Sequence, residues 1–190
     1  MENAEANFAE QSVEKRGLSL KKRKLIRNKI PRNVKKKEGI TLNTRKAESD
    51  GEYGLLLDEK IEEEVTEWME NHKPEELADV LEVIRAQCDF RPKFSFDSIK
   101  LLTKADKRFT SAVKESQSDR DIFNGMFLVQ IEQWMMSHSQ RSLANILEMT
   151  YAACGISHIT VEEVERKRQS KHAERGGFSQ RVVLEPQEVV

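Results

Sequence analysis

Apolar residues between positions 52 and 70 recur near the period of an amphipathic helix. They are Leu55, Leu56, Ile61, Val65, Trp68 and Met69. A spacing close to 3.6 residues predicts one long helix over residues 52–70. Residues 71–73 are polar and predict a turn, and Pro74 suits the first turn of a second helix that ends by residue 89. The pattern therefore predicts a helical hairpin.

The same hairpin pattern occurs a second time. Residues 61–88 align without gaps with residues 127–154, at an offset of 66, and nine of the 28 aligned pairs are identical. Unrelated segments would share about one or two. The identical pairs are Trp68/Trp134, Met69/Met135, His72/His138, Leu77/Leu143, Ala78/Ala144, Leu81/Leu147, Glu82/Glu148, Ala86/Ala152 and Cys88/Cys154. The repeat predicts helices over residues 121–136 and 141–154, with a turn at 137–140.

The repeat extends weakly upstream of the hairpins, where Arg27 aligns with Lys93 at the same offset. We therefore predict a first module at residues 24–89 and a degenerate duplicate of it at residues 90–155. A C-terminal helix and tail at residues 156–190 would complete the domain, so neither module is expected to be self-sufficient.

The N-terminal part of the chain gives a weaker pattern. Residues 1–23 have no apolar period and predict a mobile extension. The short apolar face of residues 25–30 is expected to be interrupted by Pro31, and residues 35–50 predict a polar loop.

The segments around the second hairpin are also irregular. Residues 90–117 follow no single period, and we expect an extended piece and then a helix over residues 97–104. A capping box at residues 160–163 starts a further helix, which the glycine pair at 176–177 ends. Residues 178–184 predict one short strand. The fold class is thus all-α, a four-helix-bundle-like arrangement of a duplicated hairpin, with room for one short C-terminal strand.

Composition supports a folded, water-soluble chain. With 190 residues, 37% hydrophobic and 34% charged, the chain is long enough for a core and too apolar to be disordered. No apolar run has the length of a membrane span and the acidic N-terminus lacks a signal pattern, so a cytoplasmic protein is expected. Cys88 and Cys154 occupy equivalent helix positions, where a packing role is expected rather than a disulfide or a metal site.

Charge is strongly segregated, although the net charge is only −1. Residues 15–37 carry twelve basic residues and no acid, whereas residues 59–82 carry ten acids. A basic strip beside an acidic hairpin suits a site that holds both a metal and a polyphosphate. The basic run also includes KKRK at residues 21–24, which fits a nucleic-acid-binding arm or a nuclear-import signal. Such runs are usually solvated surface, and a nucleic-acid partner is not expected.

Four acids of the first hairpin form two pairs with helical spacing. They are Glu64 with Glu67 and Glu76 with Asp79. Residues three apart share a helix face, and a short turn makes the two helices antiparallel, so all four carboxylates are expected to point into one interhelical space. A hard cation such as Mg²⁺ or Mn²⁺ relieves their repulsion, and a carboxylate or a metal-bound hydroxide would then supply the attacking water for phosphoanhydride hydrolysis.

The alternative is that the acids form an ordinary solvated helix face. The second copy argues against it, because the four acids become Gln130, Gln133, Ser142 and Asn145. These neutral side chains resemble the acids in shape or are small, as expected where a metal no longer needs to be bound.

The hairpin sequence KIEEEVTEW followed by EELADVLEV resembles the MazG-like and phosphoribosyl-ATP pyrophosphohydrolase-like all-α nucleotide pyrophosphohydrolases, whose signature is ExxE followed by ExxD. Two flanking motifs fit the same family: KLIRNKIP at residues 24–31 is similar to its KLVRDKIP, and KHAERGGFSQRVVL at residues 171–184 is similar to its K..RGGF..R.VL. The resemblance covers roughly residues 24–89 and 155–185.

The resemblance implies a metal-dependent enzyme that cuts a nucleoside triphosphate or related nucleotide between the α and β phosphates. It implies that the metal ligands and catalytic residues are Glu64, Glu67, Glu76 and Asp79, with Mg²⁺ as cofactor and Mn²⁺ as an alternative. It implies that the substrate-phosphate contacts are Lys24, Arg27, Lys29, Lys171 and Arg175.

Two features depart from the family pattern. Asn28 stands where the family commonly has Asp, and the degenerate hairpin is an insertion. Family members usually pair hairpins from separate chains, so the second hairpin would make this chain a monomeric pseudo-dimer with one working site; a homodimer stays open. No membrane partner is expected. The other function class is a nonenzymatic nucleotide- or nucleic-acid-binding regulator that uses the basic arm.

Several other residues have an ordinary structural interpretation. His72 and His138 are expected in turns, and Trp68 and Trp134 in the core rather than stacked on a base. The glycine pair at 176–177 is expected to stop a helix, and the other interpretation is a close approach of the backbone to phosphate.

Overall fold

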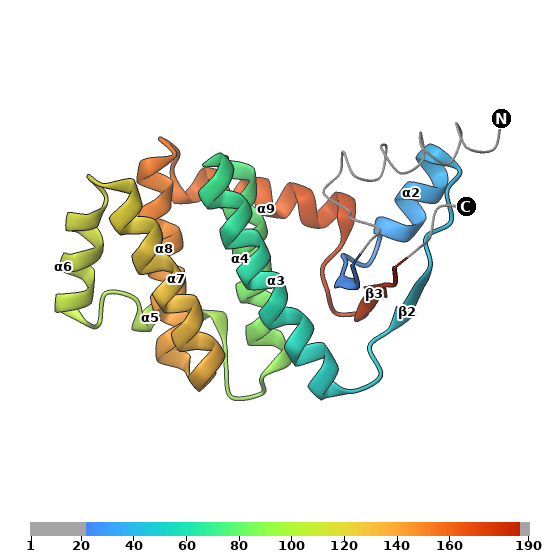
Figure 1. Ribbon diagram of the computed structural model, residues 1–190, viewed down its shortest axis with the longest axis horizontal. Helices are drawn as coiled ribbons and strands as arrows, with labels where there is room; N and C mark the ends of the chain where they lie inside the picture. The colour runs from blue at the N-terminus through green and yellow to red at the C-terminus, as the bar shows by residue number, and fades with distance from the viewer. Residues whose placement is uncertain (1–21, 187–190) are drawn as a thin grey trace. The chain divides into compact units, whose positions relative to one another are not determined.

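The computed structural model describes residues 22–186, which form eight helices and one small sheet (Figure 1). The predicted all-α class with a short C-terminal strand is confirmed. The predicted extension at residues 1–23 lies almost entirely outside the described residues. The chain divides into two compact units, Met1–Leu56 with His172–Val190 (unit 1) and Leu57–Lys171 (unit 2).

Unit 1 contains a three-stranded antiparallel sheet. Strand β3 (Val182–Leu184) lies between β1 (Lys24–Leu25) and β2 (Thr44–Lys46), with Leu25 and Arg45 both opposite Val183. A small core forms beside it from Ile26, Val34, Leu42 and Leu184. The central strand, from the C-terminal part of the chain, therefore pairs with two strands that lie far from it in the sequence.

Helix α2 (Ile30–Glu38) corrects the prediction for this region. Pro31 does not interrupt an apolar face; it lies in the first turn of α2, where its missing N–H costs no helical hydrogen bond. Gly39 ends the helix in the left-handed conformation, with φ 74°. The polar loop predicted over residues 35–50 was therefore wrong where α2 and β2 occupy it.

Unit 2 contains both predicted hairpins. The first consists of α3 (Asp50–Asn71, which enters unit 2 at Leu57) and α4 (Pro74–Phe90), and the second of α7 (Arg120–Ser137) and α8 (Gln140–Ile156). Helices α4 and α8 begin and end at the same offset of 66 as the sequence repeat. His72 and His138 lie in the two turns with φ 50° and 44°, which confirms the turn interpretation of both.

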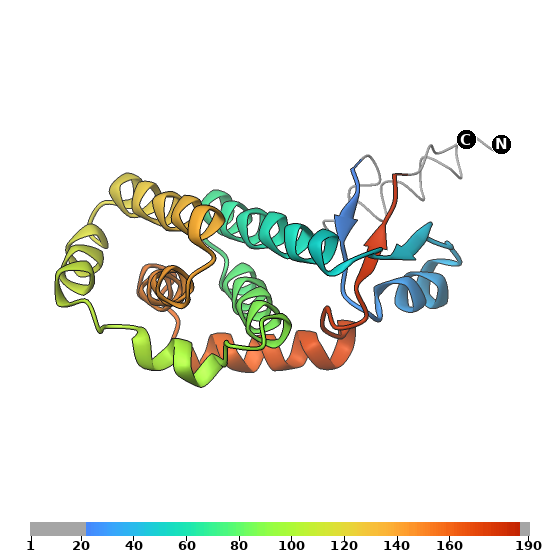
Figure 2. The same cartoon turned by 90° about the horizontal axis from the view of Figure 1, so that it is seen from below.

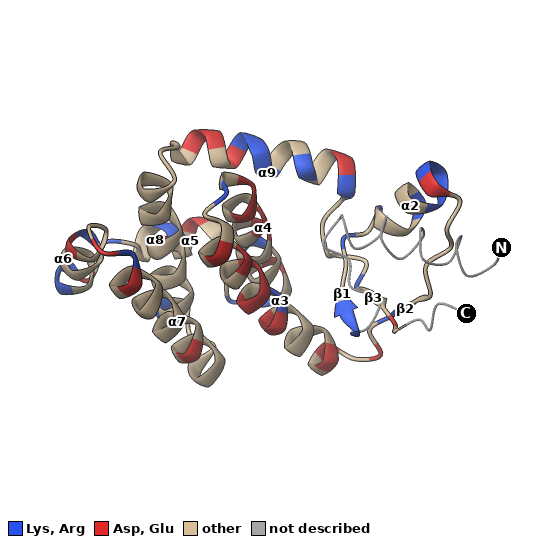
Figure 3. Cartoon of the chain, turned by 45° about the horizontal axis from the view of Figure 1, so that its top comes forward, with Lys and Arg blue, Asp and Glu red and all other residues tan. Residues whose placement is uncertain are grey.

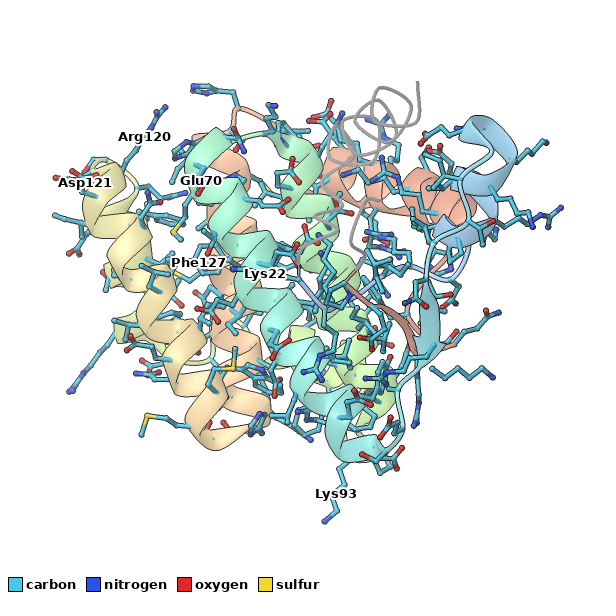
Figure 4. The ribbon with its side chains drawn as sticks, turned by 45° about the vertical axis from the view of Figure 1, so that its right-hand side comes forward. Lys22, Glu70, Lys93, Arg120, Asp121 and Phe127 are labelled. Atoms are coloured by element: carbon cyan, nitrogen blue, oxygen red, sulfur yellow. The ribbon has the colours of Figure 1, made fainter. Side chains whose placement is uncertain are left out.

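Aromatic rings join the two hairpins. The ring of Trp68 on α3 lies 5.9 Å from that of Phe123 and 6.0 Å from that of Phe127, centroid to centroid, and Phe127 extends from α7 toward α3 (Figure 4). Trp68 and Trp134 are both 0% exposed, which confirms that they belong to the core. Figure 2 shows α4 and α8 in the middle of unit 2, with α3 and α7 on one side and α5 and α9 on the other.

Three further helices complete unit 2: α5 (Phe96–Leu102), α6 (Lys107–Ser116) and α9 (Val161–Arg175, in unit 2 as far as Lys171). The capping box that starts α9 is confirmed, because the backbone N–H of Thr160 donates to Glu163 and that of Glu163 donates to Thr160 Oγ1. Helix α6 was not predicted. Its N-cap is Asp106, which accepts from the backbone N–H groups of Arg108 and Phe109.

The described helices include no candidate for a membrane span: among residues 22–186 each is too short or too polar to cross a bilayer. Cys88 and Cys154 are buried free thiols, and burial raises the pKa of each to about 12.

Candidate metal centre in the first hairpin

Three carboxylates from the two helices of the first hairpin converge. Glu64 comes from α3, and Glu76 and Asp79 come from α4, where a separation of three residues places them on one face. One carboxylate oxygen from each lies within 4.8 Å of the others. Glu64 and Asp79 are buried and Glu76 is half-buried, so the cluster lies in the interhelical space predicted from the sequence.

Glu67 is not a member of this group of three. It is half-buried on α3, three residues beyond Glu64, and it has interaction partners of its own. The structure therefore brings together three of the four predicted metal ligands and leaves the fourth beside them on the same helix.

Two lysines neutralise part of the charge of the cluster. Lys60, one turn before Glu64 on α3, lies 2.7 Å from a Glu64 carboxylate oxygen and 2.8 Å from one of Glu63. Lys171, from α9, lies 2.6 Å from Asp79 Oδ2 and donates to the backbone carbonyl of Glu75 at 2.7 Å. A divalent cation that binds here would compete with these ammonium groups for the same oxygens.

Burial sets the proton affinity of the cluster. The pKa of Glu64 is raised, first by burial and further by the neighbouring Asp79, although Lys60 acts in the opposite direction. The pKa of Glu76 is also raised, again first by burial, with Lys171 opposing the shift. Burial alone would lower the pKa of Lys60, but the carboxylates of Glu64 and Glu63 outweigh it and the pKa is raised. The cluster thus holds negative charge at a cost that a cation can remove.

Ion pairs continue from the cluster along α4 and α9. Lys167 lies 2.6 Å from Glu75, Arg168 lies 2.6 Å from Glu82, and Arg85 lies 3.2 Å from Glu165. In Figure 3 the acids gather on α3 and α4, positive and negative residues alternate along α9, and α7 and α8 are mostly uncharged. Of the five predicted phosphate contacts, only Lys171 lies in unit 2 with the acids.

The other four predicted phosphate contacts, Lys24, Arg27, Lys29 and Arg175, all lie in unit 1. Lys29 Nζ donates to the carbonyl of Ala173 at 2.7 Å. The buried Arg27 guanidinium lies 5.6 Å from the centre of the Phe178 ring. Lys24 pairs with Leu184 in the sheet, and the carbonyl of Arg175 accepts from the backbone N–H of Lys29. These contacts within unit 1 connect the KLIRNKIP motif of residues 24–31 to the C-terminal motif that contains Arg175 and Phe178.

Asn28 and Gly176 are central to that junction. The Asn28 side chain accepts from the backbone N–H of Gln180 and donates to Ser179 Oγ. Gly176 stops α9 with φ 77°, and a Cβ atom there would lie 3.1 Å from Asn28 Cβ. The helix-stop interpretation of Gly176 is confirmed, and its lack of a side chain lets the Asn28 segment approach closely.

The second hairpin replaces the acids with a neutral contact. Asn145 Nδ2 donates to Gln130 Oε1 at 2.9 Å, at the positions equivalent to Asp79 and Glu64. Ser142, in place of Glu76, is buried and its backbone N–H donates to the N-cap Ser139. Gln133, in place of Glu67, is exposed. The position of Lys60 is taken by Met126, so charge and countercharge are both lost.

Asp58 is a buried acid that the sequence reasoning missed. Its Oδ1 accepts from Gln87 Nε2 and from Trp134 Nε1, both at 2.9 Å, and its Oδ2 lies 2.7 Å from His138 Nε2. Its position among the apolar residues of α3, between Leu57 and Ile61, was the available signal. Asp58 links the first hairpin to the tryptophan and turn of the second.

Comparison of the chain with models of protein families, with curated proteins and with solved structures gave no match.

Proposed function

We propose that the chain is a metal-dependent nucleotide pyrophosphohydrolase that hydrolyses the α–β phosphoanhydride of a nucleoside triphosphate or a related nucleotide. The products are a nucleoside monophosphate and pyrophosphate. The observation that carries the proposal is the convergence of Glu64, Glu76 and Asp79, with oxygens within 4.8 Å of one another, in the hairpin whose sequence resembles the ExxE and ExxD signature.

The residues of the cluster suit a hard divalent cation. All three donors are carboxylate oxygens, which Mg²⁺ and Mn²⁺ prefer, and none is a thiolate or an imidazole. Two of the three are buried, and buried carboxylates this close are stable only with compensating positive charge. Lys60 and Lys171 supply part of that charge.

A divalent cation held there supplies Lewis-acid polarisation of the substrate phosphate oxygens. The side chains of the protein have separate tasks. Glu64 and Asp79 are the most buried members and would fix the cation. Glu76 is half-buried with a raised pKa, which suits a group that orients water and accepts its proton. Lys171, already beside Asp79, would move to a substrate phosphate oxygen when a cation takes its place.

The bond changes define the products. The water oxygen attacks the α-phosphorus, the bond from that phosphorus to the bridging oxygen breaks, and pyrophosphate leaves with the bond's electrons. The proton lost by the water is taken up by the base. A hydrolase of this kind releases no orthophosphate in the first step.

The test is a panel of nucleoside triphosphates and modified nucleotides, incubated with the full chain and Mg²⁺ or Mn²⁺. We expect at least one to give monophosphate and pyrophosphate in equal amounts, with the reaction abolished by EDTA. Separate detection of pyrophosphate and orthophosphate identifies the bond that is cut. A chain that turns over no member of the panel with either cation, or that releases only orthophosphate, would contradict the proposal.

A further inference from the structure

A cavity of about 330 Å³ lies in unit 2 away from the acid cluster. Its lining comes from α4, α5, α8 and α9, and the polar and aromatic part of that lining includes Arg85, Phe96, Lys100, Tyr151, Glu165 and Arg166. Sites that enclose small organic ligands have volumes of about 300–1,000 Å³. The cavity is therefore large enough for one aromatic ring system.

Helices α4 and α8, which line the cavity, are equivalent in the repeat, and α5 and α9 are the helices that line it from beyond the two hairpins. Three pairs of its lining residues are related by the same offset of 66 as the hairpins: Arg85 with Tyr151, Phe96 with Glu162, and Lys100 with Arg166. Two identical chains would line such a cavity with identical halves. In two of these pairs, Arg85/Tyr151 and Phe96/Glu162, the residues differ in chemistry, whereas Lys100 and Arg166 are both cations. The lining therefore suits a ligand whose two ends differ in chemistry.

The inner part of the cavity is a stacking platform. The Arg85 guanidinium carbon lies 3.8 Å from the centre of the Phe96 ring, and Glu165 holds the guanidinium at 3.2 Å. The Nε of Arg85 is buried and finds no acceptor among residues 22–186. Tyr151 is half-buried, and burial raises the pKa of its phenol, which keeps the hydroxyl protonated as a donor. A planar ring stacked on this guanidinium would complete the surface.

The exposed part of the cavity lining carries two cations and one acid, Glu162. The cations are Lys100 and Arg166, from α5 and α9, and Arg166 lies 3.7 Å from Glu163. Glu165, the inner acid, is already paired with Arg85 and Arg168. Two exposed cations next to an aromatic and guanidinium platform match a planar base joined to a phosphate group.

We propose that this cavity binds a nucleoside monophosphate or a similar phosphorylated aromatic compound, with the ring on the Arg85 platform and the phosphate between Lys100 and Arg166. This is a second site, separate from the acid cluster. Arg85 lies six residues beyond Asp79 on α4, which is about 9 Å along the helix and about 120° around it. The two sites therefore lie on different faces of α4, and binding in the cavity requires no metal.

The proposal does not depend on the hydrolase activity, so the experiment is calorimetric binding of nucleoside monophosphates to the full chain in EDTA. We expect saturable binding that Lys100→Ala/Arg166→Ala weakens about tenfold or more, since two charge-assisted hydrogen bonds are lost. The matched control is Lys107→Ala/Arg108→Ala, which removes two exposed cations from α6 and should bind like the unaltered chain. Asp79→Asn should also bind normally.

Two component probes test the two ends of the ligand. Inorganic phosphate and the free nucleosides should each bind at least about tenfold more weakly than the monophosphate. Phe96→Leu should weaken binding of the monophosphate more than binding of phosphate. The proposal is overturned if no monophosphate binds in EDTA, if Lys100→Ala/Arg166→Ala binds like its control, or if binding requires Mg²⁺ and is lost in Asp79→Asn. Activity without EDTA-resistant binding would leave the proposed hydrolase standing and this proposal refuted.

Discussion

The two hairpins of unit 2 share a scaffold and differ in electrostatics. In the first, Glu64 and Asp79 lie across the interhelical space with Lys60 and Lys171 as counterions. In the second, Gln130 and Asn145 occupy the equivalent places and share a hydrogen bond of 2.9 Å. A neutral amide pair satisfies itself, whereas a carboxylate pair must recruit positive charge from outside. The comparison shows that the fold of the hairpin does not require the acids.

A second difference between the hairpins concerns their tryptophans. Trp134 donates to the carboxylate of Asp58, which also contacts His138. Trp68 instead donates to Ser157 Oγ. In the part of the chain that the structure describes, His72 Nε2 has no hydrogen-bond partner, and neither has Oδ1 of Asn124, which takes the place of Asp58 in the repeat. Asp58 on α3 thus contacts Trp134 and His138 of the second hairpin. Asn124 Oδ1 on α7 accepts no hydrogen bond from Trp68 or His72 of the first hairpin.

Removal of one acid in each hairpin gives the largest contrast. Asp79→Asn should lower the rate of the proposed hydrolysis about a thousandfold or more, since the loss of a proposed cation ligand would forfeit several kcal/mol of transition-state stabilisation. Asn145→Ala at the equivalent position should leave the rate within a few-fold of the unaltered chain. Rates for both variants should be measured with the best nucleotide of the panel, with circular dichroism as the folding control. Equal effects of the two changes would refute the assignment of the site to the first hairpin.

Rebuilding the acids in the second hairpin should destabilise it without creating a site. Gln130→Glu/Asn145→Asp places two carboxylates where Met126 supplies no countercharge, at a cost of up to about 4 kcal/mol for charges about 4 Å apart. Urea unfolding in EDTA measures the loss, and Glu132→Gln, at an exposed position of α7, is the control for a change of charge. Activity in Asp79→Asn combined with this double variant would show instead that two acids suffice.

Removing a counterion tests the first hairpin from the other side. Lys171→Met removes the ammonium group that lies 2.6 Å from Asp79, beside Glu64 and Glu76, and should reduce the free energy of unfolding in EDTA by about 3 kcal/mol. Lys167→Met is the matched control on the same helix. Its partner Glu75 is more exposed, so its loss should cost about 1 kcal/mol or less. Addition of Mg²⁺ should raise the free energy of unfolding of Lys171→Met more than that of Lys167→Met. If Mg²⁺ changes the stability of neither variant, that result would argue against a cation at these acids.

The smallest expected effect is on pH dependence. The raised pKa values of Glu64 and Glu76 mean that the folded chain binds protons more tightly than the unfolded chain does. Stability from these groups is present below their unfolded pKa and is lost as pH rises through the folded pKa. In EDTA, Glu64→Gln should therefore gain stability relative to the unaltered chain as pH rises from the acid range to neutrality, and Gln130→Ala should show no such gain. A parallel pH profile for all three proteins would contradict this interpretation.

The sequence alone determined the helical hairpins and their duplication. The 3.6-residue period, Pro74 and the capping box predicted α3, α4, α7, α8 and the start of α9, because each is a local property of the chain. The spacing of three residues also determined that Glu76 and Asp79 share a face. The sequence alone could not reveal β1 and β2. These strands have only two and three residues, and they form because β3, far along the chain, pairs with both.

Tertiary packing decided the rest of the candidate site. Periodicity predicts the face on which a carboxylate lies but not its distance from a residue on another helix, and so the four acids of the sequence became a group of three with Glu67 outside it. The counterion Lys171 and the link from Asp58 to Trp134 likewise depend on contacts between segments more than 70 residues apart. Only the folded chain brings these charges together, since burial and counterions are set by what packs around each side chain.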